Sequence, residues 1–136
     1  MADEMNARDY VEFVKTTTSP ASSDVNELVN RINQLNSEGV DVSRLLTFAL
    51  GASAEMGEAV EIIKKCLLQG KPFDEKAKKW VCSELGDTLY YIGQFCIAMD
   101  ISFEQIMNIN YEKLKARYPE GHFTVHRSEN RRDGDI

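Results

Sequence analysis

The sequence has few cysteines, and their placement excludes two common ways of stabilising a small protein. Cys66, Cys82 and Cys96 are odd in number, widely separated and without a C-x-x-C pair. They therefore indicate neither a disulfide framework nor a zinc knuckle. Free cysteine is among the residues most often buried in proteins, so we expect three buried, reduced thiols and a cytoplasmic location.

The chain also lacks a long apolar run and an excess of basic charge. No stretch reaches the roughly 18 to 20 apolar residues of a membrane span, and residues 1–5 have neither the basic start nor the apolar middle of a signal peptide. With 16 basic and 22 acidic side chains, the net charge is −6. We therefore expect no membrane partner and no nucleic-acid partner held by bulk electrostatics.

The length suits one domain and is too short for two. The chain has 136 residues, 43% of them hydrophobic, and only three prolines. These values predict a single domain with its own core over residues 1–136. We divide it into an N-terminal segment and linker (1–22), a helical bundle (23–118) and a polar tail (119–136).

Helical periodicity dominates the first part of the chain. Residues 23–38 have the i, i+3, i+4, i+7 spacing of a helix with one apolar face, and Gly39 ends the pattern. A shorter helix before it begins after Asn6, a suitable N-cap, and the run at 16–20 forms a linker. The apolar positions of the longer helix are Val25, Leu28, Val29, Ile32 and Leu35.

Two long helices follow and are predicted to form a hairpin. The first starts at Asp41 or Ser43 and runs to Gln69, with Gly70 at the C′ position. Asp74 caps a second helix of similar length, and the short connection implies an antiparallel pair. We expect the second helix to carry these side chains toward a core: Trp80, Val81, Leu85, Leu89, Ile92 and Cys96.

A last helix is predicted from a capping box. Ser102 and Gln105 have the required spacing, and the helix continues until Pro119 stops it. The residues beyond are polar and irregular, and no strand pattern of comparable quality occurs in the sequence. The predicted fold class is therefore all-α: an antiparallel helical bundle of four to five helices with an irregular C-terminal tail.

Two acidic tetrapeptides are the candidate catalytic feature. The spacing i, i+3 sets both carboxylates of each pair on one helix face, and the pairs are Glu55 with Glu58 and Glu84 with Asp87. Glu58 and Glu84 lie about 13 residues before and after the turn, so an antiparallel hairpin brings the pairs level. A single pair is usually a solvated surface feature, but two matched pairs among apolar neighbours predict a site.

Four facing carboxylates need a cation or raised pKa values, because burying unpaired negative charge is very costly. Hard oxygen donors favour Mg²⁺, with Mn²⁺ as a substitute, over zinc. A di-iron centre would need E-x-x-H, and His122 and His126 lie outside these helices. Gly57 and Gly86 stand directly before the second acid of each pair, which indicates close helix approach or ligand access.

A Mg²⁺ site with few protein ligands expects substrate phosphates, and nearby cations that neutralise them. Asn110, Lys113 and Arg117 share one face of the last helix, where they could contact a ribose or base and hold phosphate. Lys64 and Lys65 are also candidates, although lysines near a helix C-terminus commonly complement the helix dipole.

These motifs resemble those of the all-α MazG-like nucleoside triphosphate pyrophosphohydrolases, whose mark is E-x-x-E, a spacer and then E-x-x-D. Here 25 residues separate Glu58 from Glu84, and Tyr90 and Tyr91 follow the second motif. The resemblance covers roughly residues 43–123 and includes a late run, N-x-x-K-L-x-x-R-Y-P-x-G, from Asn110 to Gly121. Ala54 stands where many relatives have a further glutamate.

The resemblance implies a helical bundle, assembled as a dimer or a dimer of dimers, that uses Mg²⁺ to split an NTP or dNTP into the monophosphate and pyrophosphate. The implied catalytic residues and metal ligands are the four acids of the two pairs. One of these acids, or Glu61 one turn further on, would orient the attacking water. The implied substrate contacts are Tyr91, Asn110, Lys113, Arg117 and Tyr118.

Two alternatives stay open. The first is a non-catalytic helical interaction module whose acids only keep it in solution. The second is a nucleotidase of the same fold that is specific for one deoxynucleotide, such as dCTP or dUTP. Lys15, Thr17 and Trp80 are candidates for contact with the base, but core or linker roles are favoured for them.

Overall fold

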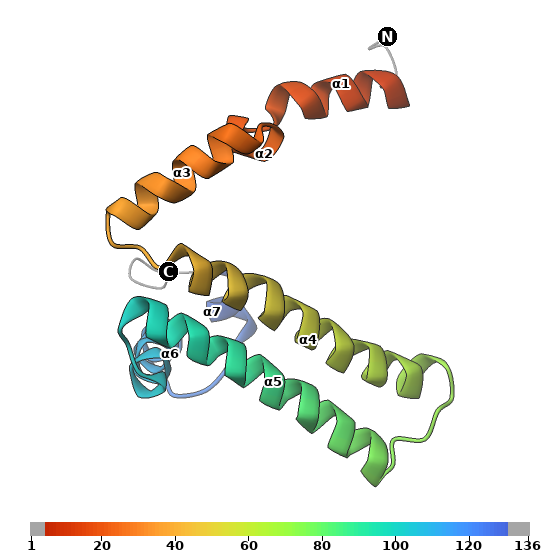
Figure 1. Ribbon diagram of the computed structural model, residues 1–136. Helices are drawn as coiled ribbons and strands as arrows, with labels where there is room; N and C mark the ends of the chain where they lie inside the picture. Colours follow the sequence, from red (N-terminus) through yellow and green to blue (C-terminus); the bar gives the residue numbers. More distant parts are fainter. Residues whose placement is uncertain (1–4, 131–136) are drawn as a thin grey trace. The chain divides into compact units, whose positions relative to one another are not determined.

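The computed structural model describes residues 5–130, and all regular structure in this range is helical (Figure 1). None of the helices in the described range has the length and apolar character needed to cross a membrane. The predicted all-α class is confirmed. The helices are α1 (Ala7–Thr17), α2 (Pro20–Ser23), α3 (Val25–Ser37), α4 (Val42–Leu68), α5 (Glu75–Met99), α6 (Phe103–Arg117) and α7 (Val125–Glu129).

The chain divides into two compact units, the first ending at Val42 and the second beginning at Ser43. The first contains α1 to α3, and the second contains nearly all of α4 together with α5 to α7. Each unit is described by itself below. The prediction of one domain over residues 1–136 stays a prediction.

Local capping explains the helices of the first unit. The side chain of Asn6 accepts a hydrogen bond of 3.0 Å from the backbone N–H of Asp9, as predicted, and Asp24 caps α3 in the same way. The predicted linker at 16–20 is shorter than expected, since α1 continues to Thr17 and α2 begins at Pro20. The apolar face of α3 remains open within this unit, where Val25 is 69% exposed.

The second unit is built on the predicted hairpin, in which α4 and α5 run antiparallel (Figure 1). Gly70 has φ +68°, a left-handed conformation that ends α4 without the strain a side chain would add. The carboxylate of Asp74 accepts a hydrogen bond of 2.9 Å from the N–H of Ala77 and so starts α5. Both helix ends are therefore set by single residues that the sequence pattern identified.

Small side chains and a few long-range contacts hold the hairpin together. Ala59, Ala77 and Thr88 are buried. Toward the open end of the hairpin, the rings of Phe48 and Phe95 lie 5.0 Å apart. Further on, the guanidinium of Arg44 donates a 2.5 Å hydrogen bond to the side-chain oxygen of Gln94. The Tyr91 ring packs directly on Gly51, so closely that a Cβ at that position would overlap it.

The expectation that the large apolar residues of α5 form a core is wrong for three of them. Trp80, Leu85 and Leu89 are 51%, 42% and 55% exposed. The reason is that two helices bury only one narrow stripe each, and small residues fill that stripe here. Cys96 is buried as expected, whereas Cys82 is exposed and Cys66 is half-buried, although all three thiols are free as predicted.

The capping box that predicted α6 is present, with Gln105 N–H donating to the Ser102 hydroxyl and Ser102 N–H donating to the Gln105 side chain. The tail is less irregular than predicted. Thr124 caps the short helix α7, and Arg127 pairs with Glu120 at 2.5 Å. Residues 131–136 of the predicted tail lie outside the described range.

The contact between Tyr91 and Gly51 predicts the effect of a single methyl group. Gly51→Ala should lower the free energy of unfolding by about 1–2 kcal/mol, because overpacking costs more than the gain in helix propensity. Gly57→Ala is the matched control on the same helix, since a Cβ there meets no atom within 4 Å, and it should gain about 1 kcal/mol. Denaturant unfolding of both variants checks this, and equal effects would contradict it.

Candidate active site

Three of the four predicted acids converge in the middle of the hairpin. Glu55 and Glu58 on α4 and Glu84 on α5 each offer a carboxylate oxygen, and these oxygens all lie within 4.8 Å of one another. Glu55 and Glu84 are half-buried, whereas Glu58 is exposed. The two pairs are thus level across the hairpin, as the positions of the acids relative to the turn predict.

The carboxylates perturb one another. Partial burial raises the pKa of Glu55 above its ordinary value, and the negative charges of Glu58, Asp87 and Glu84 raise it further. Asp87 stays outside the group of three, but it lies close enough to contribute to this effect. The site therefore concentrates negative charge that the folded chain tolerates at a cost.

This donor set fits a hard divalent cation. A hydrogen bond between the carboxyl groups of Glu55 and Glu84 also raises the pKa of Glu55, and such a bond requires a shared proton. A cation that accepts carboxylate oxygens can take the place of that proton and remove the repulsion. The oxygens favour Mg²⁺ or Mn²⁺ chemistry over a site built on sulfur or imidazole.

The two glycines beside the acids do not mark close helix approach. A Cβ at Gly57 or at Gly86 would meet no atom within 4 Å, so both positions face open space. That half of the expectation is wrong, because α4 and α5 touch through other residues. Access for a ligand is the interpretation that remains for these glycines.

Glu61, the other candidate for orienting water, lies one turn beyond Glu58 and forms ion pairs. Its carboxylate pairs with Lys64 and, at 3.3 Å, with Lys65. Hydrogen bonds from these two ammonium groups lower the pKa of Glu61, which keeps it ionised. The two lysines therefore have a partner on their own helix, in addition to any interaction with the helix dipole.

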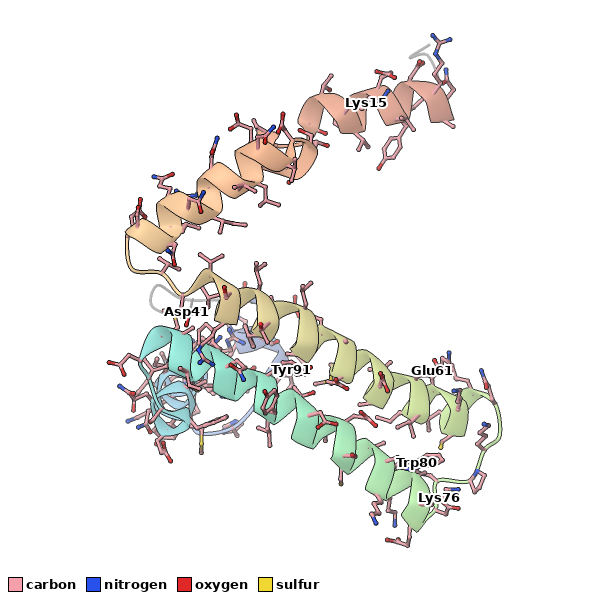
Figure 2. All side chains as sticks on the ribbon, viewed as in Figure 1. Lys15, Asp41, Glu61, Lys76, Trp80 and Tyr91 are labelled. Atoms are coloured by element: carbon pink, nitrogen blue, oxygen red, sulfur yellow. The ribbon has the colours of Figure 1, made fainter. Side chains whose placement is uncertain are left out.

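The predicted substrate contacts lie on α5 and on or just after α6. Tyr91 is on α5, one turn beyond Asp87, and its ring is held against Gly51 (Figure 2). On or just after α6, Asn110 is exposed and the other three are half-buried: Lys113, Arg117 and Tyr118. Their part in substrate binding stays a prediction.

Trp80 is the residue whose environment the sequence analysis misjudged. The residue is 51% exposed and lines a cavity, although a core or linker role was favoured. A signal was present, since Trp80 stands one turn before Glu84 and so lies toward the same side of α5 as the acids.

The comparison with protein families shows to which family the chain is related. The model of the MazG nucleotide pyrophosphohydrolase domain matches residues 44–122. The chain belongs to this family. The matched range begins near the start of α4 and ends beyond α6, so it contains all the predicted site residues of the MazG chain. No curated protein and no solved structure matches the chain.

The raised pKa of Glu55 predicts that removing its charge stabilises the protein, by an amount that depends on pH. In the absence of metal, Glu55→Gln should raise the melting temperature more at pH 7 than at pH 4. Below the ordinary glutamate pKa of 4.5, Glu55 is protonated in both the folded and the unfolded protein. As the pH rises through the higher pKa of the folded state, the wild type loses stability because Glu55 becomes charged. Thermal scans of both proteins in chelator check this.

The matched control is Glu75→Gln, which removes an acid of α5 that pairs with Lys78 instead of facing other carboxylates. It should not raise the melting temperature at either pH. Addition of Mg²⁺ should reverse the order, stabilising the wild type more than Glu55→Gln. If Glu55→Gln raised the melting temperature equally at both pH values, the electrostatic account would be contradicted.

Proposed function

We propose that this chain is a Mg²⁺-dependent nucleoside triphosphate pyrophosphohydrolase that converts an NTP or dNTP into the monophosphate and pyrophosphate. The observation that carries the proposal is the convergence of Glu55, Glu58 and Glu84 within 4.8 Å, on a hairpin that the MazG family model matches. We further propose a cytoplasmic enzyme, in line with its free thiols.

In this proposal, the four acids hold the metal and a second set of residues holds the nucleotide. Glu55, Glu58, Glu84 and Asp87 bind Mg²⁺, with Mn²⁺ as a substitute. The cationic and polar groups of α6 neutralise and orient the phosphates, and Tyr91 is a further contact to the nucleotide. The proposed nucleotide contacts are Tyr91, Asn110, Lys113, Arg117 and Tyr118.

Hydrolysis of a phosphoanhydride needs charge neutralisation and an aligned water more than covalent chemistry. Bound Mg²⁺ supplies charge neutralisation at the phosphates. The attacking water loses a proton to a carboxylate, one phosphorus–oxygen bond forms, and the bond to the leaving phosphate oxygen breaks. Glu61 suits the role of orienting this water, because its lowered pKa keeps it ionised and two lysines fix its position.

We also propose that the enzyme is a homo-oligomer, a dimer or a dimer of dimers. A stripe on α4 at the spacing i, i+4, i+7, i+11 is left open to solvent in the single chain. Its members are 43%, 56%, 38% and 77% exposed in this order: Met56, Val60, Ile63 and Leu67. A second copy would cover this apolar surface, which a stable monomer rarely exposes.

The decisive test is Mg²⁺-dependent release of pyrophosphate from a panel of NTPs and dNTPs. The wild type should release pyrophosphate and not orthophosphate, and Glu58→Ala and Asp87→Ala should each lower kcat at least about 100-fold. Glu75→Ala, on the same helix as Asp87, is the matched control and should keep full activity. The ranking of substrates distinguishes a broad enzyme from one specific for dCTP or dUTP.

The interaction-module alternative predicts a different pattern for the same experiment. A folded protein that releases no pyrophosphate across the panel, and whose melting temperature does not respond to Mg²⁺, would contradict the enzymatic proposal. The exposed apolar stripe of α4 would then be its functional feature.

The oligomer is tested by placing a charge in the α4 stripe. Val60→Glu should shift the molar mass measured by light scattering toward that of one 15.4 kDa chain. The reason is that a buried, unpaired carboxylate would cost several kcal/mol at the interface. Ser83→Glu, at an exposed polar position of α5, should leave the mass unchanged. A monodisperse wild-type monomer with full activity would contradict the proposal.

A further inference from the structure

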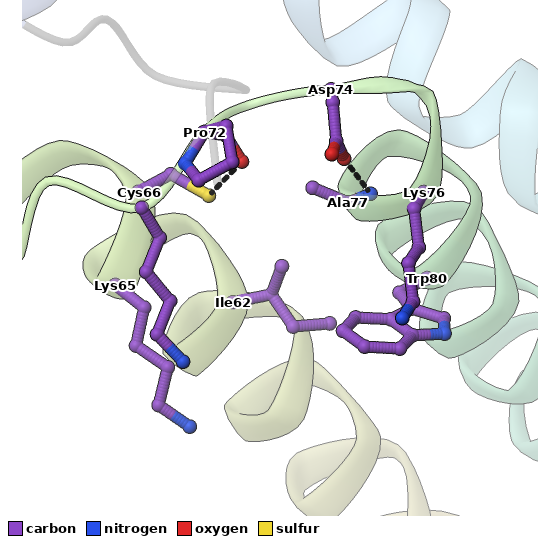
Figure 3. A pocket seen from close by; sticks show the side chains of 9 residues that line it. Ile62, Lys65, Cys66, Pro72, Asp74, Lys76, Ala77 and Trp80 are labelled. Atoms are coloured by element: carbon purple, nitrogen blue, oxygen red, sulfur yellow. Dashed lines mark hydrogen bonds between the residues drawn. The ribbon is translucent and has the colours of Figure 1, made fainter.

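A cavity at the closed end of the hairpin has no assigned role (Figure 3). Its volume is about 250 Å³, and it is formed between the end of α4, the turn and the start of α5. Pockets for drug-sized ligands are larger, about 300–1,000 Å³, so this one suits a single ring system. Ile62, Ala77 and Trp80 form much of its apolar lining.

Trp80 is the principal feature of this cavity. Ile62 from α4 points toward its ring, and the ammonium of Lys76 lies 4.7 Å from the ring centroid (Figure 3). About half of the side chain, 51%, is nevertheless exposed. A large aromatic ring contributes to folding by being buried, and a half-exposed ring beside a cavity contributes less than it could. A flat partner against Trp80 would recover that contribution.

The charge of the lining favours an anionic ligand. Three lysines reach the cavity, namely Lys65, Lys71 and Lys76, against one acid, Asp74. The carboxylate of Asp74 already accepts the hydrogen bond that caps α5, and Lys65 pairs with Glu61. The cavity thus combines an apolar, aromatic lining with a positive rim. A planar aromatic base suits the apolar, aromatic lining, and the positive rim suits the anionic molecule of which the base is part.

The position of the cavity relative to the acids points to the same class of ligand. Trp80 precedes Glu84 by four residues and Ile62 follows Glu58 by four, so these two lining residues stand one helical turn from an acid, about 5–6 Å between Cβ atoms. A nucleoside whose phosphates lie at the acids can therefore place its base at Trp80, with the sugar spanning the turn between them.

We propose that the nucleobase of the substrate stacks on Trp80 in this cavity, which makes Trp80 a residue that determines substrate specificity. This inference rests on the proposed function and adds the position of the base to it. Tyr91 is another aromatic among the proposed nucleotide contacts, but it lies on the other side of the acids along α5. The proposal assigns stacking to Trp80 instead.

Trp80 is the single tryptophan of the chain, so its fluorescence reports on this cavity directly. Titration of the wild type with nucleoside monophosphates, corrected for their absorption, should give a saturable change in emission. Ribose 5-phosphate and tripolyphosphate, which lack a base, should give no such change. An equal response to tripolyphosphate would overturn the proposal, because the cavity would then be a phosphate site.

Substitution separates stacking from other effects of Trp80. Trp80→Leu should raise KM for the preferred nucleotide about tenfold or more with kcat unchanged, since base–aromatic stacking contributes on that scale. Trp80→Phe keeps a ring and should restore most of the loss. Phe73→Leu removes an exposed aromatic of the same turn that does not line the cavity, and it should leave KM unchanged.

The outcomes distinguish this proposal from the proposed function. One outcome is that Trp80→Leu releases pyrophosphate with unaltered KM and that nucleotides do not change the Trp80 emission of the wild type. This outcome would overturn the stacking proposal and leave the enzyme proposal intact. Absence of both pyrophosphate release and nucleotide-dependent emission would overturn both. If formation of the oligomer by itself abolishes the response of Trp80 emission to nucleotide, a second copy fills the cavity. That result also contradicts the proposal.

Discussion

Repulsion between carboxylates is the constraint on which the second unit depends. Glu55, Glu58 and Glu84 place their oxygens within 4.8 Å of one another, and partial burial together with the neighbouring negative charges raises the pKa of Glu55. A chain keeps such an arrangement only if the surrounding contacts compensate for it. Here the compensation comes from the seam between α4 and α5, where Ala59 and Thr88 are buried beside the acids and the rings of Phe48 and Phe95 are in contact toward the open end.

The hairpin has two different sides because of this seam. Small residues let the helices approach, so the larger side chains are displaced outward from the contact. Apolar residues such as Val60 and Leu67 collect on one side of α4, away from the acids, while Trp80 and Glu84 share a side of α5. The proposed chemistry and the proposed assembly therefore use separate surfaces of the same two helices.

Much of this fold could be predicted from sequence because its signals are local. The caps at Asn6, Asp74 and Ser102 and the turn at Gly70 depend on neighbouring residues alone, and the equal distances from the turn bring the acids level. Burial could not be predicted in the same way. Periodicity assigns a residue to a face, but whether Trp80 or Leu89 is covered depends on what packs there in three dimensions.

The antiparallel hairpin also sets an order for folding. Contacts near the turn close short loops, whereas the pairing of Phe48 with Phe95 and of Arg44 with Gln94 closes loops of nearly fifty residues. Loop-closure entropy grows with length, so pairing should start at the turn and proceed outward. The acids meet midway along this path. The contacts that form after them, toward the open end of the hairpin, keep the mutually repelling carboxylates together.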